Sequence, residues 1–162
     1  MLQKCNTSLI LYWCLKKHIY FCTYFSTMNE VLKKYENNCF PIDIEEIISD
    51  FWLSIDYFEF TTINGFIAWN SVIINKDLEI TERRFVLAHE LWHFIDWELW
   101  ASTELFSSTD PKEKIADQFA MDLLCPTYKV KELWEEFENI PTLAQFFNVS
   151  NKIIEKKLVQ IL

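Results

Sequence analysis

Apolar side chains recur every three or four positions through most of the chain, which is the spacing of helices that bury one face. The pattern predicts a short helix over Met28–Asn37 and a second over Ile42–Trp52, with Asp43 placed to cap the second. A longer helix is predicted to begin near Thr81 and to run through the stretch that ends at Trp97. Its apolar residues cover most of its circumference, so this helix belongs in a core.

The segment between these helices has the composition of strands. Tyr57–Thr62 is rich in aromatic and β-branched residues and predicts a strand. Phe66–Trp69 and Val72–Asn75 are two further apolar runs, separated by Asn70 and Ser71, and they predict a β-hairpin. A short three-stranded sheet is therefore expected.

Helical spacing returns in the last third of the chain. Lys112–Cys125 predicts a helix that has Pro111 in its first position and Asp110 as its cap, and that stops at Pro126. Shorter helices are predicted over Lys129–Phe137 and from Asn151 onward. The fold class is therefore predicted to be α+β, with helices packed on a short three-stranded sheet and residues 141–162 as a helical tail packed on the core.

A chain of 162 residues with 51% apolar residues is long enough for one domain with a substantial core. Residues 1–27 differ from the rest, because they carry three lysines and no acid, and Met28 resembles a natural start. Their two apolar runs are each too short to cross a membrane, and Lys16 and Lys17 lie between them. We expect residues 1–27 to be a mis-assigned or weakly attached N-terminal extension, with a membrane anchor as the alternative.

The formal net charge is −9, and residues 28–162 alone contain 12 basic and 24 acidic side chains. Surfaces that bind nucleic acid need clustered lysine and arginine, so direct binding to nucleic acid is not expected. The five cysteines are an odd number without a C-x-x-C pair, which argues against a disulfide framework and against a cysteine zinc site. A reducing cytoplasm is the simplest location, and no membrane association is expected.

The long apolar helix contains His89-Glu90-Leu91-Trp92-His93, an H-E-x-x-H pattern. Residues four apart lie one turn apart on one helix face, so both imidazoles can bind one divalent metal ion, most often zinc. Glu90 lies about 100° round the helix from His89, where its carboxylate can take a proton from a water activated by the metal. The alternative is a surface helix with solvated histidines, which fits poorly with a helix that is apolar on nearly all sides.

A catalytic zinc site takes three protein ligands and leaves one position open, so a third ligand must come from outside this helix. Glu113 follows Asp110 by three residues, which is the spacing of a capping box, so Glu113 can either cap its own helix or bind the metal. Asp117, one turn further on, is an alternative ligand or a hydrogen-bond partner for one of the histidines. The residues alone leave these alternatives open.

Several segments of the chain together resemble the ImmA/IrrE metallo-endopeptidases of bacteria and their mobile elements. The similarity covers nearly all of residues 40–160, in order and with matching spacing. Two positions depart from the family pattern, since Trp92 stands where glycine is usual and Cys125 where methionine is common. The segments that carry the resemblance are Pro41–Glu45, Ile63–Phe66, Val72–Asn75, Glu82–His93, Glu113–Pro126 and Leu143–Ser150.

The resemblance implies a gluzincin-like zinc peptidase domain over residues 28–140, with zinc (Zn2+) bound by His89 and His93. The family's E-x-x-A-x-x-F-A pattern places the third zinc ligand at Glu113, and Glu90 is implied as the general base. Trp92 occupies a position that does not bind metal, so we expect it to narrow the cleft and to change which peptides enter.

The implied function is a zinc-dependent endopeptidase that cleaves a regulatory protein. The expected substrate and partner is a helix-turn-helix repressor of a mobile element or of a stress response. One alternative is a non-catalytic regulatory or toxin–antitoxin binding protein on the same fold, and the complete set of expected site residues favours the peptidase over it. Another is a transcription factor that uses residues 141–160, which have a helix-turn-helix character. The low basic charge of that tail favours packing on the core instead.

Overall fold

The computed structural model describes residues 28–35, 39–96 and 111–162. The expectations for residues 1–27, for Asp110 as a helix cap and for the end of the long helix at Trp97 lie outside the described residues. The helices are α2 (Met28–Tyr35), α3 (Ile44–Asp50), α4 (Ile80–Asp96), α5 (Pro111–Leu124), α6 (Thr127–Phe137), α7 (Ile140–Phe147) and α8 (Asn151–Ile161). The strands are β1 (Ser54–Phe58), β2 (Gly65–Ala68) and β3 (Ser71–Asn75).

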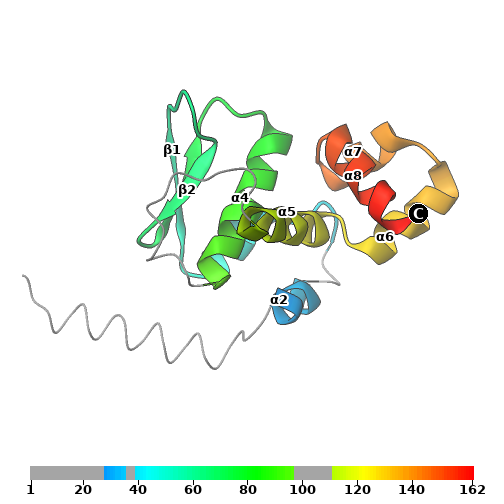
Figure 1. Ribbon diagram of the computed structural model, residues 1–162, viewed down its shortest axis with the longest axis horizontal. Helices are drawn as coiled ribbons and strands as arrows, with labels where there is room; N and C mark the ends of the chain where they lie inside the picture. Colours follow the sequence, from blue (N-terminus) through cyan, green and yellow to red (C-terminus); the bar gives the residue numbers. More distant parts are fainter. Residues whose placement is uncertain (1–27, 36–38, 97–110) are drawn as a thin grey trace, which may run out of the picture.

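The predicted α+β class with a three-stranded sheet is confirmed. β3 lies at the centre of the sheet, where it pairs with β1 in parallel and with β2 in antiparallel orientation. The predicted hairpin is therefore the β2–β3 pair. Helices α4 and α5 lie side by side in the middle of the molecule, with the sheet on one side of them and α6, α7 and α8 on the other (Figure 1).

The predicted boundaries of β1 are wrong. The strand was expected over Tyr57–Thr62, whereas β1 covers Ser54–Phe58. The parallel register pairs Phe58 with Asn75, where β3 ends, so no partner strand continues beyond that point. There the Asn75 side chain replaces the ladder, because its Nδ2 donates to the carbonyl oxygen of Phe60 at 3.0 Å. Two of the aromatic residues that suggested a strand, Phe58 and Phe60, contact each other there instead, and Phe60 also contacts Phe66 of β2.

Side-chain caps mark the start of α3 and α7. Asp43 is the N-cap of α3, as predicted, and its carboxylate accepts hydrogen bonds from the backbone N–H groups of Glu45 and Glu46 at 3.1 and 3.0 Å. α7 is capped in the same way by Asn139, which accepts from the N–H of Thr142 at 2.9 Å. α5 begins at Pro111, as predicted, whereas α4 and α6 begin one and two residues earlier than the apolar pattern indicated.

Helix α4 packs very closely against the sheet. Val72 and Ile74 of β3 are fully buried, and α4 packs against β2 and β3. A Cβ atom on Gly65, the only glycine of the chain, would lie 2.8 Å from Cγ1 of Val86 in α4. This close approach requires glycine and sets the distance between the sheet and the helix that carries the H-E-x-x-H pattern.

The C-terminal helices are attached to the same core through polar contacts. Arg84 of α4 donates from Nη2 to the carbonyl oxygen of Ile42 at 2.7 Å and from Nε to that of Asn148, after α7, at 3.1 Å. Lys157 of α8 forms an ion pair with Asp122 of α5. Among the described residues, every helix is too short or too polar to cross a bilayer.

Candidate metal centre

Both histidines of the H-E-x-x-H pattern project from one face of α4. The Nε2 atoms of His89 and His93 lie 3.1 Å apart, and the side chains are only 15% and 14% exposed. Spacing of four residues on a regular helix produces this pairing without any unusual backbone. The two imidazoles therefore lie together on one helix face, as their spacing in the sequence predicts.

Glu113 reaches the histidines from the first turn of α5. Its Oε2 lies 3.1 Å from Nε2 of His89, and its Oε1 lies 3.2 Å from Nε2 of His93. One ligand atom from each of the three side chains lies within 4.8 Å of the others, so His89, His93 and Glu113 could together hold a metal ion.

The chemistry of these atoms fits a zinc ion. Imidazole nitrogen and carboxylate oxygen bind zinc at about 2.0–2.2 Å, and two donors on a tetrahedral ion are then about 3.3–3.6 Å apart. The observed separations of 3.1–3.2 Å are close to the lower end of that range. Lone pairs of nitrogen and oxygen converge on one small volume, and a divalent cation neutralises their mutual repulsion.

Close packing of small residues brings α5 to α4. Ala88 of α4 and both Ala116 and Ala120 of α5 are completely buried, which allows the two helices to approach. The ring of Trp92 lies 5.5 Å from the ring of buried Phe119, measured between centroids. The Trp92 ring thus packs on α5 and contributes to the α4–α5 interface, and its effect on which peptides enter stays a prediction.

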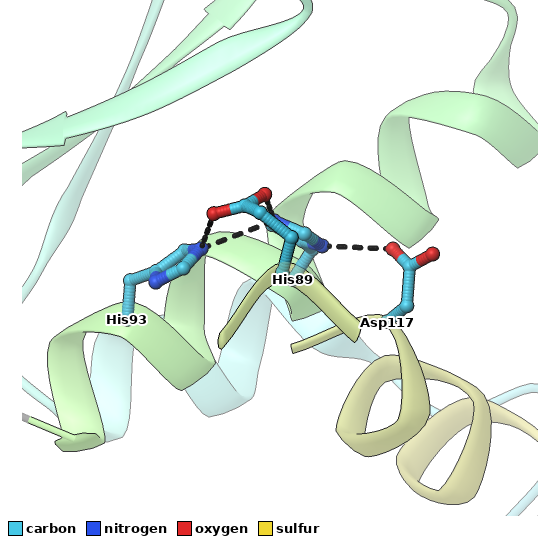
Figure 2. Close-up of polar contacts among 4 residues, drawn as sticks. His89, His93 and Asp117 are labelled. Atoms are coloured by element: carbon cyan, nitrogen blue, oxygen red, sulfur yellow. Dashed lines mark hydrogen bonds and ion pairs between the residues drawn. The ribbon is translucent and has the colours of Figure 1, made fainter. Parts of the chain in front are cut away.

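Asp117 lies on the opposite side of the His89 ring from His93 and Glu113. Its Oδ1 lies 3.1 Å from Nδ1 of His89, and a dashed line in Figure 2 marks this contact. Of the two roles considered for Asp117, the contact matches the hydrogen-bond partner, since the carboxylate touches the nitrogen that does not face Glu113. The bond with His89 is the main cause that lowers the pKa of Asp117.

The negative surroundings of His89 favour a cation. Burial is the largest single influence and lowers the pKa of the imidazole. The hydrogen bond with Asp117 and the charges of Glu90 and Glu113 outweigh it, so that the pKa is raised overall. Carboxylates that favour a proton on this ring equally favour a metal ion at its Nε2 atom.

Glu90 is nearly enclosed, with an exposed fraction of 8%. Burial raises its pKa to about 7, and the nearby Glu113 carboxylate acts in the same direction, whereas His89 lowers it. Glu90 therefore lies close enough to His89 and Glu113 for their charges to act on it. This matches the position expected one residue after the first histidine.

Sequence reasoning missed the polar link between α5 and α8. Lys156 and Lys157 were counted only as charges of the tail, yet Lys157 is 1% exposed in its ion pair with Asp122, and the charge of Lys156 acts on Asp117. A lysine at a position where the helix period demands an apolar residue is the signal that could have indicated burial.

A three-stranded sheet, a helix with paired histidines and a carboxylate from the following helix define the fold and donor set of a metallopeptidase. Residues 54–159 match the Peptidase_M78 family, described as the IrrE N-terminal-like domain, and the chain belongs to this family. The resemblance to ImmA/IrrE proteins is thereby confirmed. No curated protein matches the chain.

Proposed function

We propose that this protein is a zinc-dependent endopeptidase that cleaves a regulatory protein. Membership of a metallopeptidase family supports hydrolysis of a peptide bond in general. The observation that carries the specific proposal is the convergence of His89, His93 and Glu113 on one small volume, next to the buried carboxylate of Glu90.

In this proposal each side chain of the centre has one role. His89 and His93 would hold zinc through Nε2, and Glu113 would hold it through its carboxylate. The chemistry supplied there would be Lewis acidity, which would acidify a water molecule and polarise the carbonyl of the scissile peptide bond. Glu90 accepts a proton from the attacking water and delivers it to the nitrogen of the leaving amine, so that the C–N bond breaks without formation of an amide anion.

The substrate we propose is a helix-turn-helix repressor of a mobile element or of a stress response, as the family resemblance implies. Charge complementarity supports this choice of substrate. Residues 28–162 carry 12 basic and 24 acidic side chains, and a repressor carries a basic DNA-binding surface that an acidic protein attracts. A substrate of this kind places the reaction in the cytoplasm.

Cleavage of a helix-turn-helix repressor tests the proposal. The zinc-loaded protein is mixed with the purified repressor, and fragments are identified by intact mass. We expect two fragments from a single cut with the wild type and none with Glu90→Gln, which retains zinc and fold because it alters only the proton carrier. Equal cleavage by the Glu90→Gln variant would refute the role of Glu90.

The same mixture separates the peptidase from the non-catalytic alternative. A stable complex of zinc-loaded protein and intact repressor, without fragments after prolonged incubation, would favour a binding protein on the same fold. His93→Ala is the control for both outcomes, because it removes a metal ligand and leaves the helix itself unchanged.

A further inference from the structure

The hydrogen bond between Asp117 and His89 has a consequence for the metal centre. We propose that Asp117 is a positioning residue whose carboxylate accepts a hydrogen bond from the Nδ1–H of His89 and so keeps Nε2 unprotonated and directed at the metal. This inference rests on the proposed function, and it assigns a role to a residue that binds no metal itself.

The two ring nitrogens of His89 contact different carboxylates. Nδ1 lies 3.1 Å from Oδ1 of Asp117, and Nε2 lies 3.1 Å from Oε2 of Glu113. Asp117 and Glu113 are four residues apart on α5, so one face of this helix contacts both nitrogens of the ring. Figure 2 shows His89 between His93 on one side and Asp117 on the other.

The contact decides which tautomer is available. A neutral imidazole carries one proton, and a carboxylate next to Nδ1 stabilises that proton at Nδ1 because the carboxylate can only accept. The lone pair is then at Nε2, where the metal needs it. Without this acceptor, the proton can occupy Nε2 and must be displaced before metal binds, which weakens the affinity for metal.

The C-terminal helix α8 packs on the stretch of α5 that contains Asp117. Two neighbouring contacts attach α8 to the same stretch of α5. They are the ion pair of Lys157 with Asp122 and the paired amides of Gln118 and Gln160, whose nitrogen-to-oxygen distance is 2.7 Å for the bond donated by Gln160. Neither contact involves Asp117 or His89, so these residues supply control variants.

Zinc affinity provides the first test, measured by competition with a chromophoric chelator. Removal of a hydrogen-bond partner of a metal-binding histidine typically weakens metal affinity about 10- to 100-fold, and we expect a loss in this range for Asp117→Ala. Asp117→Asn should lose less, because its amide oxygen can accept the same bond. Gln118→Ala is the matched control, because it removes a contact between α5 and α8 without touching His89, and its zinc affinity should equal that of the wild type.

A structural role for Asp117 would give a different pattern. The side chain is 41% exposed, so its replacement by alanine should leave the unfolding midpoint of the zinc-free protein within the range of the Gln118→Ala control. If Asp117→Ala lowers this midpoint and zinc affinity together, and Asp117→Asn does not restore the affinity, the residue is structural and the inference is overturned.

Imidazole NMR provides a readout that does not depend on affinity. The chain has only three histidines, so single His→Ala variants assign their ring signals directly. In the zinc-loaded wild type we expect a slowly exchanging Nδ1–H proton on His89 that Asp117→Ala loses. Wild-type zinc affinity of Asp117→Ala, together with weakened binding in His93→Ala, would overturn this inference alone. A wild type that binds no zinc would overturn the proposed function as well.

Discussion

Lys157 of α8 and Asp122 of α5 form an ion pair in which the lysine is 1% exposed and the carboxylate 25%. Asp122 also accepts a hydrogen bond from the amide of Gln118 at 3.0 Å. The lysine therefore depends on the ion pair more than the aspartate does, because the carboxylate has a second hydrogen-bond partner and access to water. A buried ammonium group without its carboxylate has to lose its charge or draw water into the core.

Asp122→Ala should accordingly destabilise the protein by about 3 kcal/mol, the lower end of the range for breaking a buried pair. Lys157→Met should cost clearly less, since Asp122 keeps Gln118 and solvent as partners and the apolar side chain fills the buried site. Urea unfolding followed by tryptophan fluorescence measures both changes. Equal losses in the two variants would show that the burial of the lysine does not determine the cost of breaking the pair.

Arg84 connects three segments that are distant in the sequence, because its guanidinium donates to the carbonyl oxygens of Ile42 and Asn148. Lysine cannot donate in two fixed directions from one planar group, so Arg84→Lys should lose one of these bonds. We expect a decrease of about 1–3 kcal/mol in the free energy of unfolding. The exposed Lys152 supplies a control, and Lys152→Ala should unfold like the wild type. An unchanged Arg84→Lys variant would mean that water replaces the lost donor at no cost.

Gly65→Ala places a Cβ atom 2.8 Å from Cγ1 of Val86, 2.9 Å from Cδ1 of Ile74 and 3.1 Å from the carbonyl oxygen of Ile73. Valine is short and stiff and the carbonyl is part of the ladder, so α4 must move away from the sheet. We expect a destabilisation of about 1–3 kcal/mol in thermal unfolding. Truncation of the neighbour in Gly65→Ala/Val86→Ala should recover part of the strain, and a double variant that is simply additive would contradict the contact.

Glu113→Gln tests whether the first turn of α5 supplies a metal ligand or a helix cap. A capping box accepts glutamine as well as glutamate, so the helical content measured by circular dichroism should stay the same. A neutral amide oxygen is a weaker donor to zinc and leaves the charge of the cation uncompensated, so zinc affinity should fall clearly. Competition with a chromophoric chelator measures this affinity. Retention of wild-type affinity would mean that the third ligand is another residue.

Local chemistry along the chain was sufficient for several features of this protein. The Asp43 cap needs only the next three residues, and the pairing of His89 with His93 needs only the period of one helix. The β2–β3 hairpin likewise joins neighbouring segments. These features could be predicted because the interacting groups are close in the sequence, so a regular backbone alone brings them together.

The tertiary structure decided the features that join distant parts of the chain. The position of Glu113 beside His89 depends on how α5 packs on α4, and the residues by themselves left it undecided between ligand and cap. The end of β1 at Phe58 follows from where β3 stops, and the burial of Lys157 follows from the approach of α8 to Asp122. In each case the outcome depends on an interaction partner across a packed interface, and the propensity of the segment itself contains no information about that partner.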